Sequence, residues 1–450
     1  MNIFLHRDDL RIHDNRGLKA ASNSGNTIPV YIDDPRVKEK TGINKRAFRE
    51  RGLKKLRDKY EEKGSGLIIR QGKTEEKLRD LIDERTVDSI YFARSYTPAK
   101  RRIGNEIKSL DTETKSINDR LLVEPQQLEQ EYDTFSPFYR EWKKVEKSNP
   151  TEEPENLASV DSEIPNLDSE PEADIPEAGE EKALNRWSKF KNKELKDYKD
   201  RRDDVANPRY VSKLSMYYSS GMIGKRRVLK DVENLMDKEN DSDKIRNYAK
   251  YRNEIAWGEF FYQIMYHNPN AVDQNYKDIP NKIEWRNDPE EFEAWKKGKT
   301  GVPFVDAGMR QLRNEGYMHN RLRQNVASFL TKHLMTDWRK GAKVFRKHLV
   351  DHNEPANNGG WQWSASTGTD SVPIRIFNPV KQGRQYDIHA EYIKRHVPEL
   401  RDIDPNSIHE WVEMTEEERE KYDTEYPHPI IDFNKRYHIG KKMFENALGN

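Results

Sequence analysis

The 450-residue sequence contains no cysteine. Disulfide bonds, cysteine-ligated zinc, iron–sulfur clusters and thiol nucleophiles are therefore all excluded. The twelve histidines are scattered and form no H-E-x-x-H or comparable metal-binding pattern. We accordingly predict no metal site.

Long hydrophobic runs are also missing. No apolar stretch approaches the roughly 20 residues that a membrane-spanning helix needs. The N-terminus, Met1–Asp8, is charged from the start and lacks the apolar segment of a signal peptide. We therefore expect a cytoplasmic protein without a membrane partner, long enough for more than one domain.

The net charge of +1 hides an asymmetry. Residues 151–181 contain twelve aspartates and glutamates and no lysine or arginine, so the rest of the chain carries a net charge of +13. A basic body with an acidic segment suits a polyanionic partner such as nucleic acid. An ordinary solvated surface rich in both signs explains the charge about as well.

Residues 1–125 alternate short apolar runs with polar helical stretches. The pattern predicts strands over Asn2–Leu5, Thr27–Ile32, Gly66–Arg70 and Ser89–Phe92, and helices over Lys45–Lys63, Thr74–Glu84 and Ala99–Leu110. This alternation indicates a Rossmann-like parallel sheet covered by helices, which we assign to an α/β domain over residues 1–130. No G-x-G-x-x-G or P-loop motif is present, so neither type of nucleotide site is expected there.

Residues 131–182 form the expected interdomain linker. It begins with S-P-F-Y-R-E-W-K-K at Ser136–Lys144, where aromatic residues stand among basic ones. Ser148–Glu181 follows and is rich in Pro, Glu, Asp and Ser. This second part has too little apolar surface to order itself, so we expect an acidic, partly disordered segment that runs over the surface.

From residue 183 to residue 450 the hydrophobic period is helical, which predicts an all-α domain. The expected helices are Ala183–Arg202, Gly224–Asp237, Ile245–Met265, Pro289–Lys296, Val305–Glu315, His319–Lys332, Lys340–Asp351 and Ile388–His396.

The most informative stretch is A-N-N-G-G-W-Q-W-S-A-S-T-G-T-D at Ala356–Asp370. Adjacent asparagines and glycines allow a close backbone approach beside side-chain amides, and Trp361 and Trp363 follow. The mixture suits a flat, largely aromatic ligand. A Gly/Asn turn before a buried tryptophan explains the segment alone equally well.

Two predicted helices present polar groups beside apolar ones. In His319–Lys332, Asn320, Arg321 and Gln324 share a face, which is either solvent surface or a wall of donors. In Tyr251–Phe261, Glu254 and Trp257 share a face and could hold a planar heterocycle by a hydrogen bond and stacking. The alternative is a helix with a half-buried tryptophan.

A third segment, Asn207–Gly224, contains Ser212 and Ser215 near a helix start. Hydroxyl groups and free backbone N–H groups at such a place can receive a phosphate. Serine at this position is more often just a cap.

The motif N-N-G-G-W-Q-W-S-A-S-T-G-T-D, followed by R-I-F-N-P and preceded by N-E-I-A-W and M-H-N-R-L-R, closely resembles the cryptochrome/photolyase family. The match is nearest to the class I cyclobutane pyrimidine dimer (CPD) photolyases and covers nearly the whole chain. It implies an α/β domain that can hold an antenna pigment and a helical domain that binds FAD in a bent conformation. It also implies light-driven repair of CPDs in DNA, in which excited reduced FAD lends an electron to a flipped-out dimer.

The resemblance also implies a set of flavin contacts. Asp351 and Arg323 would form an ion pair beside the isoalloxazine, and Asn357 would face its N5 atom. Val211 replaces the usual Thr, and Asn353 stands where many members have Asp. The full set of implied FAD-binding residues is Tyr198, Val211, Ser212, Lys213, Leu214, Ser215, Arg323, Asp351, His352, Asn353 and Asn357.

The lesion site carries over in the same way. Glu254 would bind the thymine edge, Trp257 and Trp363 would form two aromatic walls, and Gln324 replaces the more usual Met. The implied catalytic residues are Glu254, Trp257, Asn320, Gln324, Asn357 and Trp363, and the implied DNA contacts are Arg202, Glu254, Trp257, Asn320, Arg321, Arg375 and Gln382. Trp361, Trp338 and Trp295 match the three-tryptophan relay that reduces the flavin from the surface.

An antenna is harder to assign. Members that bind a deazaflavin or a folate use carboxylates near the fourth strand, and Ala93–Arg101 contains none. The resemblance implies FAD as the cofactor. The missing carboxylates leave open whether a second chromophore, of the deazaflavin or the folate type, is bound.

The resulting hypothesis is a monomeric, FAD-dependent deoxyribodipyrimidine photo-lyase acting on damaged DNA. One alternative is a cryptochrome-type photoreceptor, which need not keep Glu254, Trp257 and Trp363 together. Another is a (6-4) photolyase, which uses histidine where this chain has Asn320 and Gln324. A DNA-binding flavoprotein without light chemistry is the third.

Overall fold

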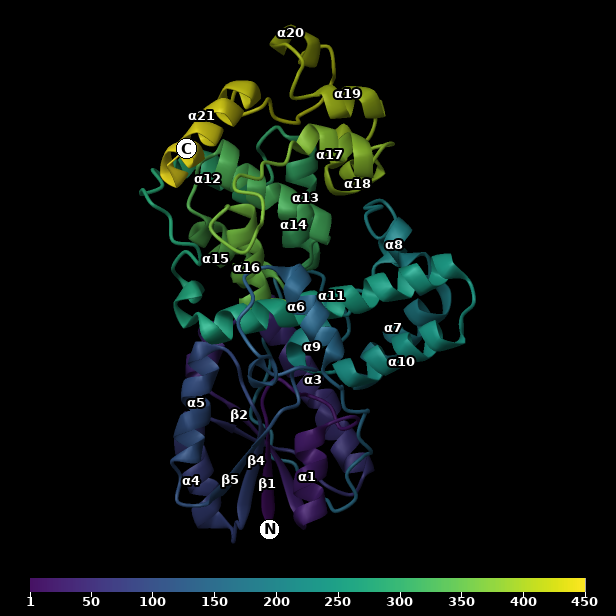
Figure 1. The fold of residues 1–450 in the computed structure, drawn as a ribbon, viewed down its shortest axis with the longest axis vertical. Coiled ribbons are helices and arrows are strands. Elements are labelled where there is room, and N and C mark those ends of the chain that lie inside the picture. The colour runs from purple at the N-terminus through teal and green to yellow at the C-terminus, as the bar shows by residue number, and fades with distance from the viewer. Residues whose placement is uncertain (450) are drawn as a thin grey trace.

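The computed structural model describes residues 1–449, which form an α/β body and a helical body joined by a long connecting segment (Figure 1). The α/β body contains the N-terminus, and the helical body occupies the other end of the molecule. The predicted fold class is confirmed.

Five parallel strands form the sheet in the order β3-β2-β1-β4-β5. They are β1 (Asn2–His6), β2 (Thr27–Asp33), β3 (Ile68–Gln71), β4 (Ser89–Ala93) and β5 (Glu113–Ile117). The first four were predicted. The fifth was missed because it lies at the sheet edge, where E-T-K-S-I stays partly exposed and shows no apolar run.

Side chains alternate between the two faces of the sheet. Ile3 and Leu5 pack with α4 (Thr74–Glu84) and α5 (Pro98–Lys108). Phe4 and Tyr91 pack on the other face, with α1 (Arg16–Ser24) and α3 (Ile43–Glu62). This second core continues into the helical body, so the two bodies share apolar packing.

The acidic connecting segment lies on the protein body. Two backbone N–H groups of this segment donate hydrogen bonds to Ser22 Oγ in α1. In addition, Ile69 N–H in β3 donates to the carbonyl of Glu163 in the segment at 2.7 Å. Leu167 and Ile175 are buried. The expectation that this segment cannot order itself is wrong for these residues, because its few apolar side chains fall where the body offers a surface.

Of the remaining helices, α2 lies between β2 and α3 in the α/β body, and the others build the helical body and the segment that leads to it. They are α2 (Pro35–Lys38), α6 (Phe135–Lys144), α7 (Glu180–Lys193), α8 (Tyr198–Arg201), α9 (Ser215–Ser220), α10 (Lys225–Lys238), α11 (Ser242–His267), α12 (Pro289–Lys297), α13 (Pro303–Glu315), α14 (Asn320–Ser328), α15 (Trp338–His348), α16 (Glu354–Ser364), α17 (Pro379–Tyr386), α18 (Glu391–His396), α19 (Pro405–Glu410), α20 (Glu416–Arg419) and α21 (Phe433–Leu448). The helices predicted in this part are present, with shifted ends and with Ala183–Arg202 divided between α7 and α8.

The motif around Asn357 and Trp361 does not form a turn. It lies in α16, where the side chain of Asn353 caps the helix by accepting from Ala356 N–H. The Gly/Asn turn considered from the sequence is therefore wrong. A proper N-cap and a proline in the first turn outweigh the low helix propensity of two glycines.

Candidate functional site

A cavity of about 600 Å³ opens between α11, α14 and α16. Its lining contains most of the residues singled out from the sequence: Tyr198, Arg202, Ser212, Ser215, Glu254, Trp257, Asn320, Arg323, Gln324, Asp351, His352, Asn353, Asn357, Trp361 and Trp363. Tyr198 and Trp363, which are 165 positions apart in the chain, thus meet around one space.

Three glycines shape this cavity. A Cβ at Gly359 would lie 2.2 Å from the Phe261 ring, so glycine is required for α16 to approach α11. Gly258 of α11 and Gly360 of α16 also line the cavity, and a Cβ at either position would meet nothing within 4 Å. The helices therefore touch at one glycine and leave space beside the other two.

An ion pair lies in the cavity wall. Arg323 Nη2 donates to Asp351 Oδ2 at 2.8 Å, and Ser215 Oγ donates to the same oxygen at 2.6 Å. The predicted pairing of Arg323 with Asp351 is confirmed. Although burial alone would lower the pKa of the Arg323 guanidinium, the adjacent carboxylate raises it, so this side chain remains a cation.

Polar atoms in the lining are left for a ligand. Within residues 1–449, Asp351 Oδ1, Asn357 Oδ1 and Trp361 Nε1 are buried and have no hydrogen-bond partner. The amide of Asn357 donates from Nδ2 to the carbonyl of Ala342 at 3.2 Å, so its oxygen is the free end. Buried polar groups of this kind are normally satisfied. The lining therefore fits a polar, partly aromatic ligand that presents a donor to Asn357.

Glu254 lies in the same wall between two cations. Its Oε1 is 2.5 Å from Arg202 Nη1 and 2.7 Å from Lys250 Nζ. The pair with Lys250 is an i,i+4 pair on α11, and the two cations together hold the carboxylate in one orientation.

Of the tryptophans that line the cavity, Trp257 and Trp363 each have a side chain packed against the indole. Phe135 stacks on Trp257 with ring centroids 3.8 Å apart and planes inclined by 8°. The guanidinium of Arg375 lies 4.8 Å from the Trp363 ring and pairs with Asp370. The cavity is thus bounded by supported aromatic surfaces.

The N-terminus of α14 is fixed by His319. Its Nδ1 accepts from Arg321 N–H at 3.1 Å, so the ring proton is on Nε2, which donates to the carbonyl of Arg202 at 2.9 Å. Burial lowers the pKa of His319 to about 4. The neutral imidazole therefore joins the helix that carries Asn320 and Gln324 to the residue that pairs with Glu254.

The predicted tryptophan relay is only partly supported. Trp361 lines the cavity, and its ring centroid lies 6.0 Å from that of Trp295. Trp295 is fully buried and donates to the carbonyl of Val326. A relay that ended at Trp295 would therefore end below the protein surface. The sequence motif did not distinguish it from Trp285, ten positions earlier, which is partly exposed.

Several other predicted residues do not line the cavity. The carbonyl of Val211 accepts from Arg186 Nη2, and Lys213 has a left-handed backbone with φ of 50°. Leu214 is buried. Arg321 pairs with Asp203 at 2.8 Å, and the remaining predicted residues outside the lining are Trp338, Arg375 and Gln382.

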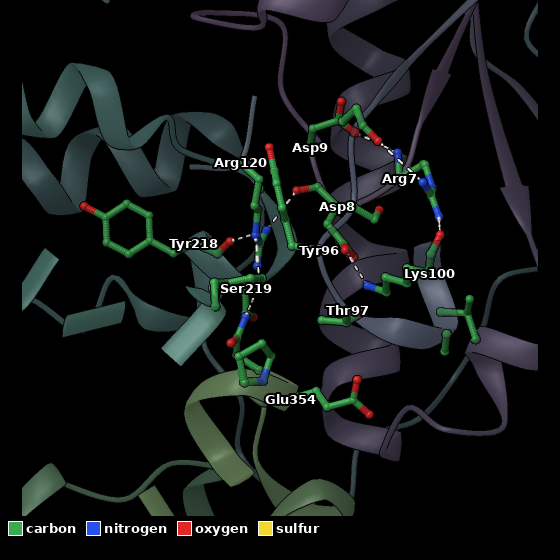
Figure 2. A pocket seen from close by; sticks show the side chains of 18 of the residues that line it. Arg7, Asp8, Asp9, Tyr96, Thr97, Lys100, Arg120, Tyr218, Ser219 and Glu354 are labelled. Atoms are coloured by element: carbon green, nitrogen blue, oxygen red, sulfur yellow. Dashed lines mark hydrogen bonds and ion pairs between the residues drawn. The ribbon is translucent and has the colours of Figure 1, made fainter. Parts of the chain in front are cut away.

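A second cavity, of about 340 Å³, lies between the α/β body and the helical body (Figure 2). Figure 2 shows Arg7, Asp8 and Lys100 on one side and Arg120, Tyr218 and Ser219 on another. Asp8 pairs with Lys100. Burial alone would raise the pKa of the Asp8 carboxyl, but Lys100 and Arg120 hold it well below its ordinary value.

The carboxylates that Ala93–Arg101 lacks reach this second cavity from elsewhere. Asp8 and Asp9 come from the charged loop after β1, and Glu354 comes from α16. Burial, with the nearby Lys100, lowers the pKa of Lys45 to about 7. The sequence did not predict this convergence because the contributing segments are far apart in the chain.

The two cavities share a wall. Tyr262 lines both, and its hydroxyl accepts from Arg120 Nε at 3.1 Å and from Asn353 Nδ2 at 2.7 Å. Arg120 also donates to the carbonyls of Asp8 and Tyr218. Groups bound in the two spaces would be separated by little more than these side chains.

Family models match both bodies. The model for DNA photolyase matches residues 2–155, and the model for the FAD binding domain of DNA photolyase matches residues 251–446. A deoxyribodipyrimidine photo-lyase of Halobacterium salinarum is 37% identical over 481 residues, which cover 100% of both chains. The chain belongs to the cryptochrome/photolyase family.

Solved structures of photolyases have the same fold. A bacterial class III photolyase from Agrobacterium tumefaciens is 33% identical with a TM-score of 0.90, over 100% of this chain and 98% of the other. An archaeal photolyase from Sulfolobus tokodaii, solved with two FAD molecules, is 31% identical with a TM-score of 0.85, over 99% of this chain and 100% of the other.

Some residues of the site were not predicted. Phe135, Lys250, Tyr262 and His319 each hold or border a predicted residue. Only the Lys250–Glu254 spacing left a signal in the sequence.

Among residues 1–449, no helix is long and apolar enough to cross a membrane.

Proposed function

We propose that this protein is a deoxyribodipyrimidine photo-lyase that repairs CPDs in DNA with light and FAD. The observation that carries the proposal is the lining of the 600 Å³ cavity, where Glu254, Trp257 and Trp363 border the same space as Asn357 and Asp351. One group of residues suits a pair of flipped-out bases and the other suits a flavin.

FAD would be held by the residues with free polar atoms. Arg323, Ser215 and Asp351 form one hydrogen-bonded set, and the free oxygen of Asn357 would accept from a flavin N–H group. FAD supplies the chemistry: in its reduced, excited form it lends an electron to the dimer. The protein binds and orients the flavin, and it closes the space beside it with the helices around Gly359.

The protein's own contribution to repair is positioning and electrostatics. Trp257 and Trp363 would hold the dimer by stacking, and Asn320 and Gln324 of α14 would hydrogen-bond base edges. Glu254 would exchange part of its pairing with Arg202 and Lys250 for the thymine edge. Its carboxylate oxygen would accept from a base N–H group and so fix the orientation of the dimer in the pocket.

DNA would be bound through cations that are already oriented by carboxylates. Arg202, Arg321 and Arg375 pair with Glu254, Asp203 and Asp370, respectively. Phosphates would compete for these guanidinium groups, so affinity should fall steeply as salt rises. We further propose that the protein works on the DNA of the cell as a monomer, which size-exclusion chromatography with light scattering tests.

The second cavity is proposed as the site of a second chromophore. Its acidic and basic groups come from both bodies, and it shares Tyr262 with the first cavity. The absorption spectrum of the purified protein, followed by identification of the released pigments, tests both sites. One FAD per chain supports the main proposal, and a chain purified from its native host without any flavin contradicts it.

Repair itself is tested with an oligonucleotide that carries one thymine dimer. Incubation with the reduced protein under near-ultraviolet or blue light should restore the undamaged oligonucleotide, and a dark incubation should not. No restoration in light would favour the photoreceptor alternative.

A further inference from the structure

One face of the Trp257 indole is covered by Phe135, the first residue of α6, which does not itself line the cavity. The ring centroids are 3.8 Å apart and the planes are inclined by only 8°. The rings of Phe260 and Phe261 also pack near the indole, with their centroids 5.7 Å and 5.9 Å from the indole centroid. Three phenylalanine rings therefore pack around the indole, which is half-buried and lines the cavity.

Helix α6 is itself fixed to α11. Trp142 Nε1 donates to Glu259 Oε2 at 2.9 Å, and Glu259 is fully buried two positions after Trp257. Glu259 also accepts from Leu122 N–H and Val123 N–H. The helix that presents Phe135 thus has little freedom to move relative to the helix that carries Trp257.

The residues just before α6 reach the other aromatic wall. Tyr276 donates from its hydroxyl to Asp133 Oδ1 at 2.6 Å, and Tyr276 N–H donates to Gln362 Oε1 at 2.7 Å. Gln362 is buried and precedes Trp363 in α16. A three-residue segment therefore contacts one wall directly and is linked to the other by two hydrogen bonds.

We propose that Phe135 is a positioning residue for the lesion pocket, and that Asp133–Phe135 sets the placement of Trp257 relative to Trp363. The proposal rests on the function proposed above. A flipped dimer must fit between two flat surfaces, and a tryptophan held in one orientation costs less free energy to order when the dimer binds. Phe135 does not line the cavity, so it would act through Trp257.

The test compares four variants in the full-length, FAD-loaded protein. Phe135→Leu keeps most of the apolar volume but removes the flat ring, and Phe135→Ala removes both. Phe135→Tyr keeps the flat ring and should therefore keep the wild-type affinity for dimer-containing DNA. Tyr132→Ala is the matched control, because the Tyr132 ring packs on Phe138 at 6.4 Å and has no stacking contact with Trp257.

The measurements are FAD content, dimer repaired per absorbed photon at saturating substrate, and the dimer-DNA concentration that gives half-maximal repair. We expect Phe135→Leu to raise the half-saturating concentration about five- to tenfold, the order expected from the loss of one stacked aromatic pair. FAD content and saturated yield should stay at the wild-type level. Phe135→Tyr and Tyr132→Ala should behave as wild type.

An unchanged half-saturating concentration in Phe135→Leu would overturn the proposal. So would an equal change in Tyr132→Ala, or a failure of Phe135→Tyr to rescue, because either result assigns the effect to general packing. If Phe135→Ala does not fold, the Leu variant still decides. Wild-type protein that repairs no dimer would instead contradict the proposed function, so the two failures are distinct.

Discussion

The carboxylate of Glu254 lies 2.5 Å from the guanidinium of Arg202, so the residue expected to bind the dimer is already paired with a residue expected to bind DNA. The pairing holds the carboxylate of Glu254 in the cavity wall before any substrate arrives. Binding of DNA would draw Arg202 toward phosphate and free the carboxylate for a base edge.

Replacement of Glu254 by Ala should therefore weaken dimer binding and also lower the number of dimers repaired per photon. Loss of one charge-assisted hydrogen bond corresponds to about 1–3 kcal/mol, and FAD content should not change. The matched control is Asp243→Ala, which removes an exposed carboxylate from the first turn of the same helix. Wild-type affinity and yield in Glu254→Ala would show that the carboxylate has no part in repair.

The tryptophans make separable predictions about reduction of the flavin. Trp338→Phe keeps the apolar volume but removes an oxidisable indole, so light-driven reduction should slow strongly while chemically reduced protein still repairs. Trp285→Phe should have the same effect, because Trp285 is partly exposed and its neighbour Arg286 donates to the carbonyl of Met335 near Trp338.

Trp295→Phe serves as the comparison, since Trp295 is fully buried. It should slow reduction less than Trp285→Phe does. Transient absorption of the oxidised protein after a laser flash measures all three rates. The reverse order, with Trp295→Phe the more damaging, would restore Trp295 as the outer member of the relay.

His319 predicts a loss of stability in acid. Burial lowers its pKa in the folded protein to about 4, below the ordinary value of 6.5. The stabilisation by the neutral ring is fully present above pH 6.5 and is lost as the pH falls toward 4. Linkage gives a loss of about 2 kcal/mol at pH 5.

His319→Asn keeps a helix-capping acceptor that does not titrate. Urea unfolding at pH 7 and at pH 5 should show a smaller drop in the free energy of unfolding for this variant than for wild type. Equal drops would mean that other groups account for the pH dependence.

The acidic segment contributes to stability. Replacing residues 151–181 with a short Gly/Ser linker removes the buried side chains of Leu167 and Ile175, each of which contributes about 1.5–3 kcal/mol. Thermal unfolding should therefore shift downward. The exposed-charge variant Glu170→Gln should leave the unfolding midpoint unchanged, and a midpoint unaffected by the linker replacement would show that the contacts with Ser22 and Ile69 do not matter.

The parts of the fold that were predictable are those with a strong local period. The apolar strands of the sheet and the helices of the C-terminal half follow directly from the sequence pattern. Strand β5 did not, because an edge strand needs little apolar character, and α16 did not, because tertiary contacts at Gly359 override the helix propensity of glycine.

The site was predictable where family motifs name the residues and not where packing decides. Motifs identified Glu254, Trp257 and Asn357, and the cavity brings them together. They did not reveal Phe135 behind Trp257 or His319 between Arg202 and α14, because such contacts join segments with no common pattern. Nor did they show that Trp295 is buried and Trp285 partly exposed, since exposure is a property of the folded chain.

The central claim is that the cavity lined by Glu254, Trp257 and Trp363 repairs cyclobutane dimers with light. The most direct test illuminates reduced protein with two oligonucleotides, one carrying a cyclobutane thymine dimer and one carrying a (6-4) photoproduct. The pocket contains Asn320 and Gln324 where (6-4) repair would use histidine, so we predict restoration of the first oligonucleotide and no change in the second. Repair of the (6-4) lesion, or of neither lesion, would contradict the account.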